Sequence, residues 1–221
     1  MIQPVSRKNV LVCAGPVSLA ALFALTGCQA TSTELFNGRD FTGWTYHLSD
    51  PDVPMEEVWS VEDGVLKCTG NPPGYLRTIK EDYHDYVLEV EWRWPGQGGN
   101  NGVLVHTTTP GALGVWPKSI EVQLQDGNAG DFWIIGTELK VENEEERRSG
   151  RRYRNLVDDV EKPLGQWNRI QITCRGDEIV VMVNGRLVNH ATDCSVTRGA
   201  IALQSEGTPI EYRDIRLRPL K

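Results

Sequence analysis

The sequence has no GxSxG nucleophile elbow, no phosphate-binding P-loop, no HExxH zinc motif and no Rossmann glycine pattern. Each of these motifs places a nucleophile, a phosphate or a metal at a defined point of a fold. Their absence argues against a serine hydrolase, a kinase and a nicotinamide-dependent enzyme. Basic residues are also scarce: after residue 27, 21 Lys and Arg face 30 Asp and Glu, a net charge near −9. That balance argues against nucleic acid as a partner.

Cysteine spacing predicts no zinc site. Cys68, Cys174 and Cys194 follow Cys28 in the chain, and none belongs to a CxxC or Cys/His pattern. Three thiols form at most one disulfide, and the sequence does not choose the pair. We expect all three to pack structurally, with no disulfide essential for stability.

The longest apolar run is too short to span a membrane as a helix. Val10–Leu25 has 16 residues, whereas a transmembrane helix needs about 20. The run follows Arg7 and Lys8, a pattern typical of a secretory signal.

The run ends in Leu25-Thr26-Gly27-Cys28, which resembles the lipobox of bacterial lipoproteins. We therefore predict a signal peptide at 1–27, lipidation at Cys28 and a tether over 28–34. An ordinary signal with an incidental cysteine is the alternative. An acylated terminus anchors a domain without spanning the bilayer, so we expect a cell-envelope location, on the periplasmic or outer-membrane face.

Helical periodicity is nearly absent from residues 35–221, which we interpret as one domain. Period-two alternation recurs instead, which is typical of half-buried strands. The clearest runs are 86–94, 120–125, 170–174, 179–183 and 210–217. Asn184-Gly185 and Asp63-Gly64 predict tight hairpins. Many short strands without crossover helices predict an all-β jelly-roll sandwich of two antiparallel sheets. The charge-dense run 142–154 is the exception, interpreted as a solvated loop with a short helix as the alternative.

The run 120–125 carries the main site hypothesis. Alternation places Glu121, Gln123 and Gln125 on one face and apolar residues on the other. Three adjacent polar side chains indicate a groove face, and the alternative is a solvent-facing polar strand. A bulge after Leu124 would turn Asp126 onto the Glu121 face. The strand is similar to the E-x-D-x-x-E strand of laminarinase-type glycoside hydrolases, with Gln123 replacing the central carboxylate.

Histidine and aromatic residues add candidates. His106 ends a strand beside a Gly/Asn-rich loop, and its alternation with Leu104 suggests a catalytic side chain, although a lone histidine is more often structural. Trp116 and Trp133 flank the carboxylate strand, and Tyr75 follows Gly74. Aromatic rings stack on the apolar faces of sugars, so these side chains suggest carbohydrate binding.

Motifs in sequence order resemble the 3-keto-disaccharide hydrolase family, whose fold is the concanavalin-A-like jelly roll. They are 35–44, 59–66, 86–93, 101–103, 120–124, 165–168, 183–185, 201–207 and 210–215. The resemblance covers residues 35–218 and implies cleavage of glycosides oxidised to a ketone at C3.

A C3 ketone acidifies the C2 proton, so a base, an acid and an electrophile are sufficient for elimination, and water can then add back. Glu121 is the expected base, with Asp126 and His106 completing the catalytic set. A divalent metal ion is a possible electrophile, held by these residues and Glu206. Glu206 stands where the family often has histidine, so no histidine role is transferred there.

The remaining substrate-binding candidates are Asn101, Lys118, Trp133, Tyr75, Gln123, Gln125 and Glu206. The favoured function is hydrolase or lyase activity on 3-keto-glycosides. A non-catalytic carbohydrate-binding module is the first alternative, and a structural envelope protein or a conventional glycosidase remains open. Paired carboxylates favour catalysis, because a lectin needs neither a base nor an acid.

Overall fold

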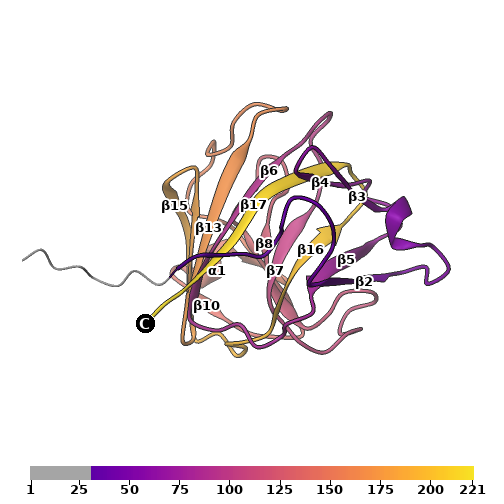
Figure 1. The fold of residues 1–221 in the computed structure, drawn as a ribbon. Coiled ribbons are helices and arrows are strands. Elements are labelled where there is room, and N and C mark those ends of the chain that lie inside the picture. Colours follow the sequence, from indigo (N-terminus) through magenta and orange to yellow (C-terminus); the bar gives the residue numbers. More distant parts are fainter. Residues whose placement is uncertain (1–30) are drawn as a thin grey trace, which may run out of the picture.

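The computed structural model describes residues 31–221, so the predicted signal peptide and Cys28 lie outside the described residues. Two antiparallel sheets form a jelly-roll β-sandwich, which confirms the predicted fold class. Figure 1 shows β13, β6 and β17 in one layer and β8, β7 and β16 in the other. Within the described range, no helix is long and apolar enough to cross a membrane.

The first sheet has nine strands. Their order is β10 (Lys140–Val141), β15 (Arg186–Thr192), β14 (Glu178–Val183), β13 (Asn168–Arg175), β6 (Tyr86–Arg93), β17 (Ile210–Pro219), β4 (Val65–Cys68) and β3 (Trp59–Glu62), with β1 (Thr33–Glu34) paired to β17. The second sheet has eight strands. Their order is β11 (Arg148–Ser149), β12 (Arg152–Tyr153), β9 (Phe132–Ile135), β8 (Ser119–Gln123), β7 (Gly102–Thr107), β16 (Ala200–Ser205), β5 (Gly74–Thr78) and β2 (Trp44–Leu48). A short 3-10 helix, η1, spans Met55–Glu57.

Both predicted hairpins are confirmed. Asn184 and Gly185 connect β14 to β15 with φ of 49° and 81°. Asp63 and Gly64 connect β3 to β4 with φ of 52° and 78°. Two successive positive φ angles match the right-handed twist of the flanking strands, which is why Asn-Gly and Asp-Gly predict such turns.

The core lies between the sheets and follows the period-two pattern. On β6, Leu88, Val90 and Trp92 are fully buried, whereas Glu89 and Glu91 point outward. Burying such a side chain contributes about 1.5–3 kcal/mol. Cys68, Cys174 and Cys194 are buried in the same core as free thiols.

The interpretation of 142–154 as a solvated loop was wrong. The run contains α1 (Glu144–Arg147) and strands β11 and β12. Arg147 is only 8% exposed and donates to the carbonyl oxygens of Glu142 and Arg154 and to Oδ1 of Asn189. One guanidinium carries five donors, so a charged residue here organises a folded segment.

Candidate active site

Glu121 lies near the middle of the second sheet. It pairs with Leu104 on β7 and with Trp133 on β9. Its sequence neighbours Ile120 and Val122 are fully buried in the core. Directly opposed residues share a face, so Glu121 points away from the core, as the alternation predicted.

A cavity of about 230 Å³, here called the groove, opens on this outer face. Its lining residues are Asn100, Trp116, Glu121, Gln123, Gln125, Trp133, Ile135, Arg151 and Glu206. Glu121 is 6% exposed, so the carboxyl lies deep in the groove.

The lining residues are ordered along the strands. Asn100 bridges to Gly207, which places Glu206 at the end of the groove where β7 begins. Glu121 lies further along, and Ile135 pairs with Ser119, two residues before Glu121 on β8. Glu206, Glu121 and Ile135 therefore follow one another along the groove.

The absence of a side chain at Gly102 shapes the site. A Cβ there would lie 2.7 Å from Oε1 of Gln204 and 2.8 Å from Cγ of Glu121. Glycine therefore lets these two side chains come together over the β7 backbone.

Burial makes both groove carboxyls weaker acids than an exposed glutamate. It raises the pKa of Glu121 to about 8, with the Glu206 charge adding to the effect and a hydrogen bond from Gln204 opposing it. Burial also raises the pKa of Glu206 to about 7, opposed by the positive charge of Arg151. Like charges in a poorly hydrated site disfavour double ionisation, so near neutral pH the pair retains one proton.

Arg151 is the only cation among the described residues that line the groove. Its guanidinium lies 5.4 Å from the ring centroid of Trp133, and Nη1 donates to the carbonyl oxygen of Ile134 at 3.2 Å. The remaining guanidinium donors can reach a bound anion or carbonyl group.

Buried polar atoms without a protein partner gather at the groove. Within residues 31–221 they include Oδ1 of Asn100, Oε2 of Glu206, Nε1 of Trp133 and Oε1 of the adjacent Gln204. An unmade buried hydrogen bond costs about 1–3 kcal/mol. Three acceptors and one donor beside two tryptophan rings form a surface complementary to a polyhydroxylated ring.

The family model of the 3-keto-alpha-glucoside-1,2-lyase-like domain matches residues 31–218. The chain belongs to this family. Membership supports a carbohydrate-related function. None of the curated proteins is a significant match.

Solved structures share the fold. A candidate glycosyl hydrolase from Parabacteroides distasonis has a TM-score of 0.62 at 24% identity, covering 86% of this chain and 100% of that chain. The carbohydrate-binding module CBM66 from Bacillus subtilis has a TM-score of 0.58 at 10% identity, covering 81% of this chain and 97% of that chain. The β-glucanase of Bacillus licheniformis has a TM-score of 0.52 at 15% identity, covering 87% of this chain and 99% of that chain.

The groove of this family member contains Glu121, Gln123, Gln125, Trp133 and Glu206 of the predicted site residues. Gln123 also has a structural role. Its Oε1 accepts hydrogen bonds from the backbone N–H groups of Leu124 and Gln125 at 2.9 and 3.0 Å. The amide therefore ends β8 and fixes the chain that carries Gln125.

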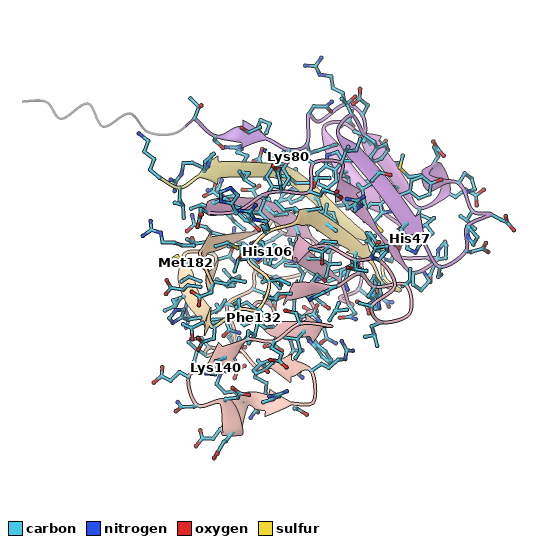
Figure 2. All side chains as sticks on the ribbon, turned by 90° about the horizontal axis from the view of Figure 1, so that it is seen from below. His47, Lys80, His106, Phe132, Lys140 and Met182 are labelled. Atoms are coloured by element: carbon cyan, nitrogen blue, oxygen red, sulfur yellow. The ribbon has the colours of Figure 1, made fainter. Side chains whose placement is uncertain are left out.

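His106 does not reach the groove, so the prediction of a catalytic role for this side chain was wrong. It is fully buried in the interior of the molecule (Figure 2), where its ring lies edge-on to Tyr86 at 5.8 Å and Nδ1 bonds the carbonyl oxygen of Val196. Its φ of 54° and the shift in β7–β16 register break the expected alternation with Leu104. Burial lowers the pKa of His106 to about 4, which suits a neutral structural histidine.

Asp126 does not reach the groove either. The expected bulge is absent, because β8 ends at Gln123 and the chain turns at Asp126 and Gly127. Asp126 is exposed and lies against Gly98, where a Cβ would come within 2.1 Å of its Oδ2.

Three further predicted residues lie outside the groove lining. Asn101 points to the opposite side from Gly102 and donates to the carbonyl oxygen of Thr208, while Asn100 takes its predicted place. Lys118 directly precedes β8 and lies beside Gly136, which directly follows β9. Tyr75 faces the groove side of the sheet, where it is buried in an apolar cluster and its ring centroid lies 5.4 Å from that of His47.

Sequence reasoning missed Arg151, Ile135 and Gln204. Arg151 belongs to the charge-dense run, and only the folding of β12 against β9 brings it near Trp133. Gln204 lies in the closing motif 201–207, where a polar residue within an apolar run was the available signal.

The residues proposed to bind a metal are not brought together. Across residues 31–221, no group of three or more His, Cys, Asp and Glu side chains is arranged to hold a metal ion. Of the four suggested ligands, Glu121 and Glu206 line the groove, whereas Asp126 and His106 do not.

Proposed function

We propose that this protein cleaves glycosides whose sugar carries a ketone at C3, by eliminating the substituent at C1. One observation carries the proposal: two buried carboxyls with different raised pKa values line one groove. Such a pair supplies a base and an acid at the same pH. Family membership supports this choice of substrate class.

Glu206 is the base in this mechanism, and Glu121 is the acid. Glu206 has the lower pKa because it is less buried than Glu121 and because its charge raises the pKa of Glu121, whereas Arg151 favours the charged form of both carboxyls. Its carboxylate takes the proton from C2, which the neighbouring ketone acidifies. Glu121 retains its proton and gives it to the glycosidic oxygen as the C1–O bond breaks. These roles replace the sequence-based expectation of Glu121 as the base.

Arg151 supplies the electrophile. Removal of the C2 proton places negative charge on the C3 oxygen, and a guanidinium donor stabilises that charge most strongly in a dry groove. The products are an alcohol and a sugar with a C1=C2 double bond conjugated to the ketone. Addition of water across that bond then gives net hydrolysis.

The test is a 3-keto-glucoside deuterated at C2. Elimination breaks the C2–H bond, so deuterium should slow turnover and solvent deuterium should enter C2 when the protonated substrate is used. A direct displacement at C1 leaves this bond intact. Turnover without either isotope signature would contradict elimination.

Glu206→Gln should lower turnover by about 10² or more, the usual worth of a general base. Glu121→Gln should lower turnover by a similar factor when the leaving group is poor, and by a smaller factor when the leaving group is good. Glu57→Gln, an exposed residue on η1, is the matched control and should change neither. Full turnover in Glu206→Gln would refute its role as the base.

A carbohydrate-binding module is the second candidate, favoured by the unpartnered polar atoms and the two tryptophans at the groove. Calorimetric binding of unoxidised sugars without cleavage of any 3-keto-glycoside, with or without a divalent metal, would establish it instead. Under either function we propose export to the cell envelope with lipid attachment at Cys28.

A further inference from the structure

A small apolar cluster lies outside the core, on the groove side of the second sheet. Its buried members are Tyr75, Leu104, Ile135 and Ala202, with Trp116 packed against them. The outward face of an antiparallel sandwich is commonly polar. An apolar cluster beside two ionisable carboxyls therefore requires a separate explanation.

The cluster borders the groove, since Leu104 pairs with Glu121 and Tyr75 with Gln204, and its members Ile135 and Trp116 reach the end beyond Glu121. Glu206 and Asn100 mark the opposite end, and Glu121 lies between. Ile135, which pairs with Ser119 two residues before Glu121, and Trp116 form the part of the cluster that lines the cavity. Along the groove, the proposed base Glu206 is followed by the proposed acid Glu121. Ile135 and Trp116 come next and are here called the apolar wall.

We propose that the apolar wall binds the leaving group, and that the preferred substrates are 3-keto-glycosides whose aglycone presents an aromatic or other flat apolar face. This inference rests on the proposed function. The base acts at C2, and the acid acts on the oxygen that joins C1 to the aglycone. A substrate aligned with both extends its aglycone past Glu121, away from Glu206 and toward Trp116.

Trp116 is suited to this role. Its backbone N–H donates to the carbonyl oxygen of Leu113 at 3.0 Å and its carbonyl accepts from the Leu113 N–H at 3.1 Å, which fixes the turn that carries the ring. The ring is half-buried, with one part packed on the cluster and another on the cavity. A fixed aromatic ring stacks on a second ring with little loss of side-chain entropy.

The test compares benzyl and methyl 3-keto-α-glucosides, the anomer in the family's description. Both aglycones leave as simple alcohols of similar acidity, so the phenyl ring is the main difference. We expect kcat/KM to be at least about tenfold higher for the benzyl compound, equivalent to about 1.4 kcal/mol. Equal values would overturn the aglycone assignment and leave the elimination mechanism intact. No cleavage of either compound would overturn the proposed function itself.

Variants of Trp116 test whether this side chain causes the preference for the benzyl compound. Trp116→Ala should lower kcat/KM for the benzyl compound about tenfold and leave the methyl compound nearly unchanged, while Trp116→Phe should keep most of the preference. Trp167→Ala is the matched control, because that ring lies on the other sheet between Arg93 and Arg213. An equal loss on both substrates in Trp116→Ala, or an unchanged preference, would overturn the assignment.

Discussion

Glu121 is a carboxyl in a position that a folded protein usually gives to an apolar or paired residue. It is 6% exposed, and a hydrogen bond from Gln204 only partly offsets the loss of hydration. Buried acids without an ion-pair partner are uncommon because ionisation is costly. That cost holds the proton on Glu121 near neutral pH, which is the condition an acid catalyst needs.

The two raised pKa values predict a narrow pH optimum. As pH rises through about 7, Glu206 loses its proton and becomes a base, and above about 8 Glu121 loses the proton it donates. A plot of kcat/KM against pH should therefore be bell-shaped, with both limbs belonging to the coupled pair. Glu121→Gln, measured with a good leaving group, should lose the alkaline limb. A flat profile from about pH 5 to 9 would contradict the assignment.

Glu121→Gln should raise the stability of the fold at alkaline pH, although it lowers activity. The pKa of Glu121 is raised from 4.5 to about 8 in the folded state, so folding is progressively disfavoured as pH rises between these values. Glu121→Gln removes this penalty. Its free energy of unfolding should exceed that of the native protein by on the order of a few kcal/mol at pH 9 and match it near pH 5. Urea denaturation at both pH values measures the difference, and Glu57→Gln should show none.

Gly102 offers a steric test of the same site. Gly102→Ala would place Cβ 2.7 Å from Oε1 of Gln204 and 2.8 Å from Cγ of Glu121. Both side chains must move, and a displacement of about 1 Å in a catalytic group can cost about 10² in rate. We expect that loss in turnover with a small change in melting temperature. Gly96→Ala, where no atom lies within 4 Å of the new Cβ, is the control. Native turnover in Gly102→Ala would show that the geometry is not critical.

At the scale of elements, three adjacent strands assemble the site. β7 contributes Gly102, β8 contributes Glu121 and β9 contributes Trp133, all held by antiparallel register. A shift of one residue would move Glu121 into the core and Ile120 into the groove. The apolar residues that alternate with the groove residues therefore fix the register of the site.

The segment of α1, β11 and β12 is the second structural unit of the site because it carries Arg151. Arg147→Met would leave the carbonyl oxygens of Glu142 and Arg154 without their donor. We expect a loss of about 2–4 kcal/mol in unfolding free energy and reduced turnover from displacement of Arg151. Arg148→Met should cost less than about 1 kcal/mol, because its pair with Glu144 is exposed. Similar urea midpoints for the two variants would refute the distinction.

At the scale of the whole molecule, the lipobox-like sequence makes a prediction that lies outside the described residues. Cys28→Ser should move the protein from the membrane fraction to a soluble or unprocessed form, because acylation at Cys28 supplies the proposed membrane anchor. Cys13→Ser, within the same leader, is the matched control and should remain in the membrane fraction. Unchanged membrane partition of Cys28→Ser would refute the lipoprotein assignment.

The sandwich, both hairpins and the groove face of β8 follow from the amino-acid sequence alone. These features depend on local patterns: alternation decides which face of a strand is apolar, and Asn-Gly or Asp-Gly favours the positive φ angles of a tight turn. Glu121, Gln123 and Gln125 were therefore predicted together from a single run, before any contact between strands was known.

The residues that complete the site are determined by long-range packing of the folded chain. Glu206 and Arg151 reach Glu121 from separate segments, and pairing between distant strands determines their positions. His106 and Asp126 were misplaced because a positive φ and a turn interrupted the alternation on which their prediction depended. The pKa order that separates base from acid likewise arises from burial and neighbouring charge. Both are properties of the folded chain, so no single run of sequence contains them.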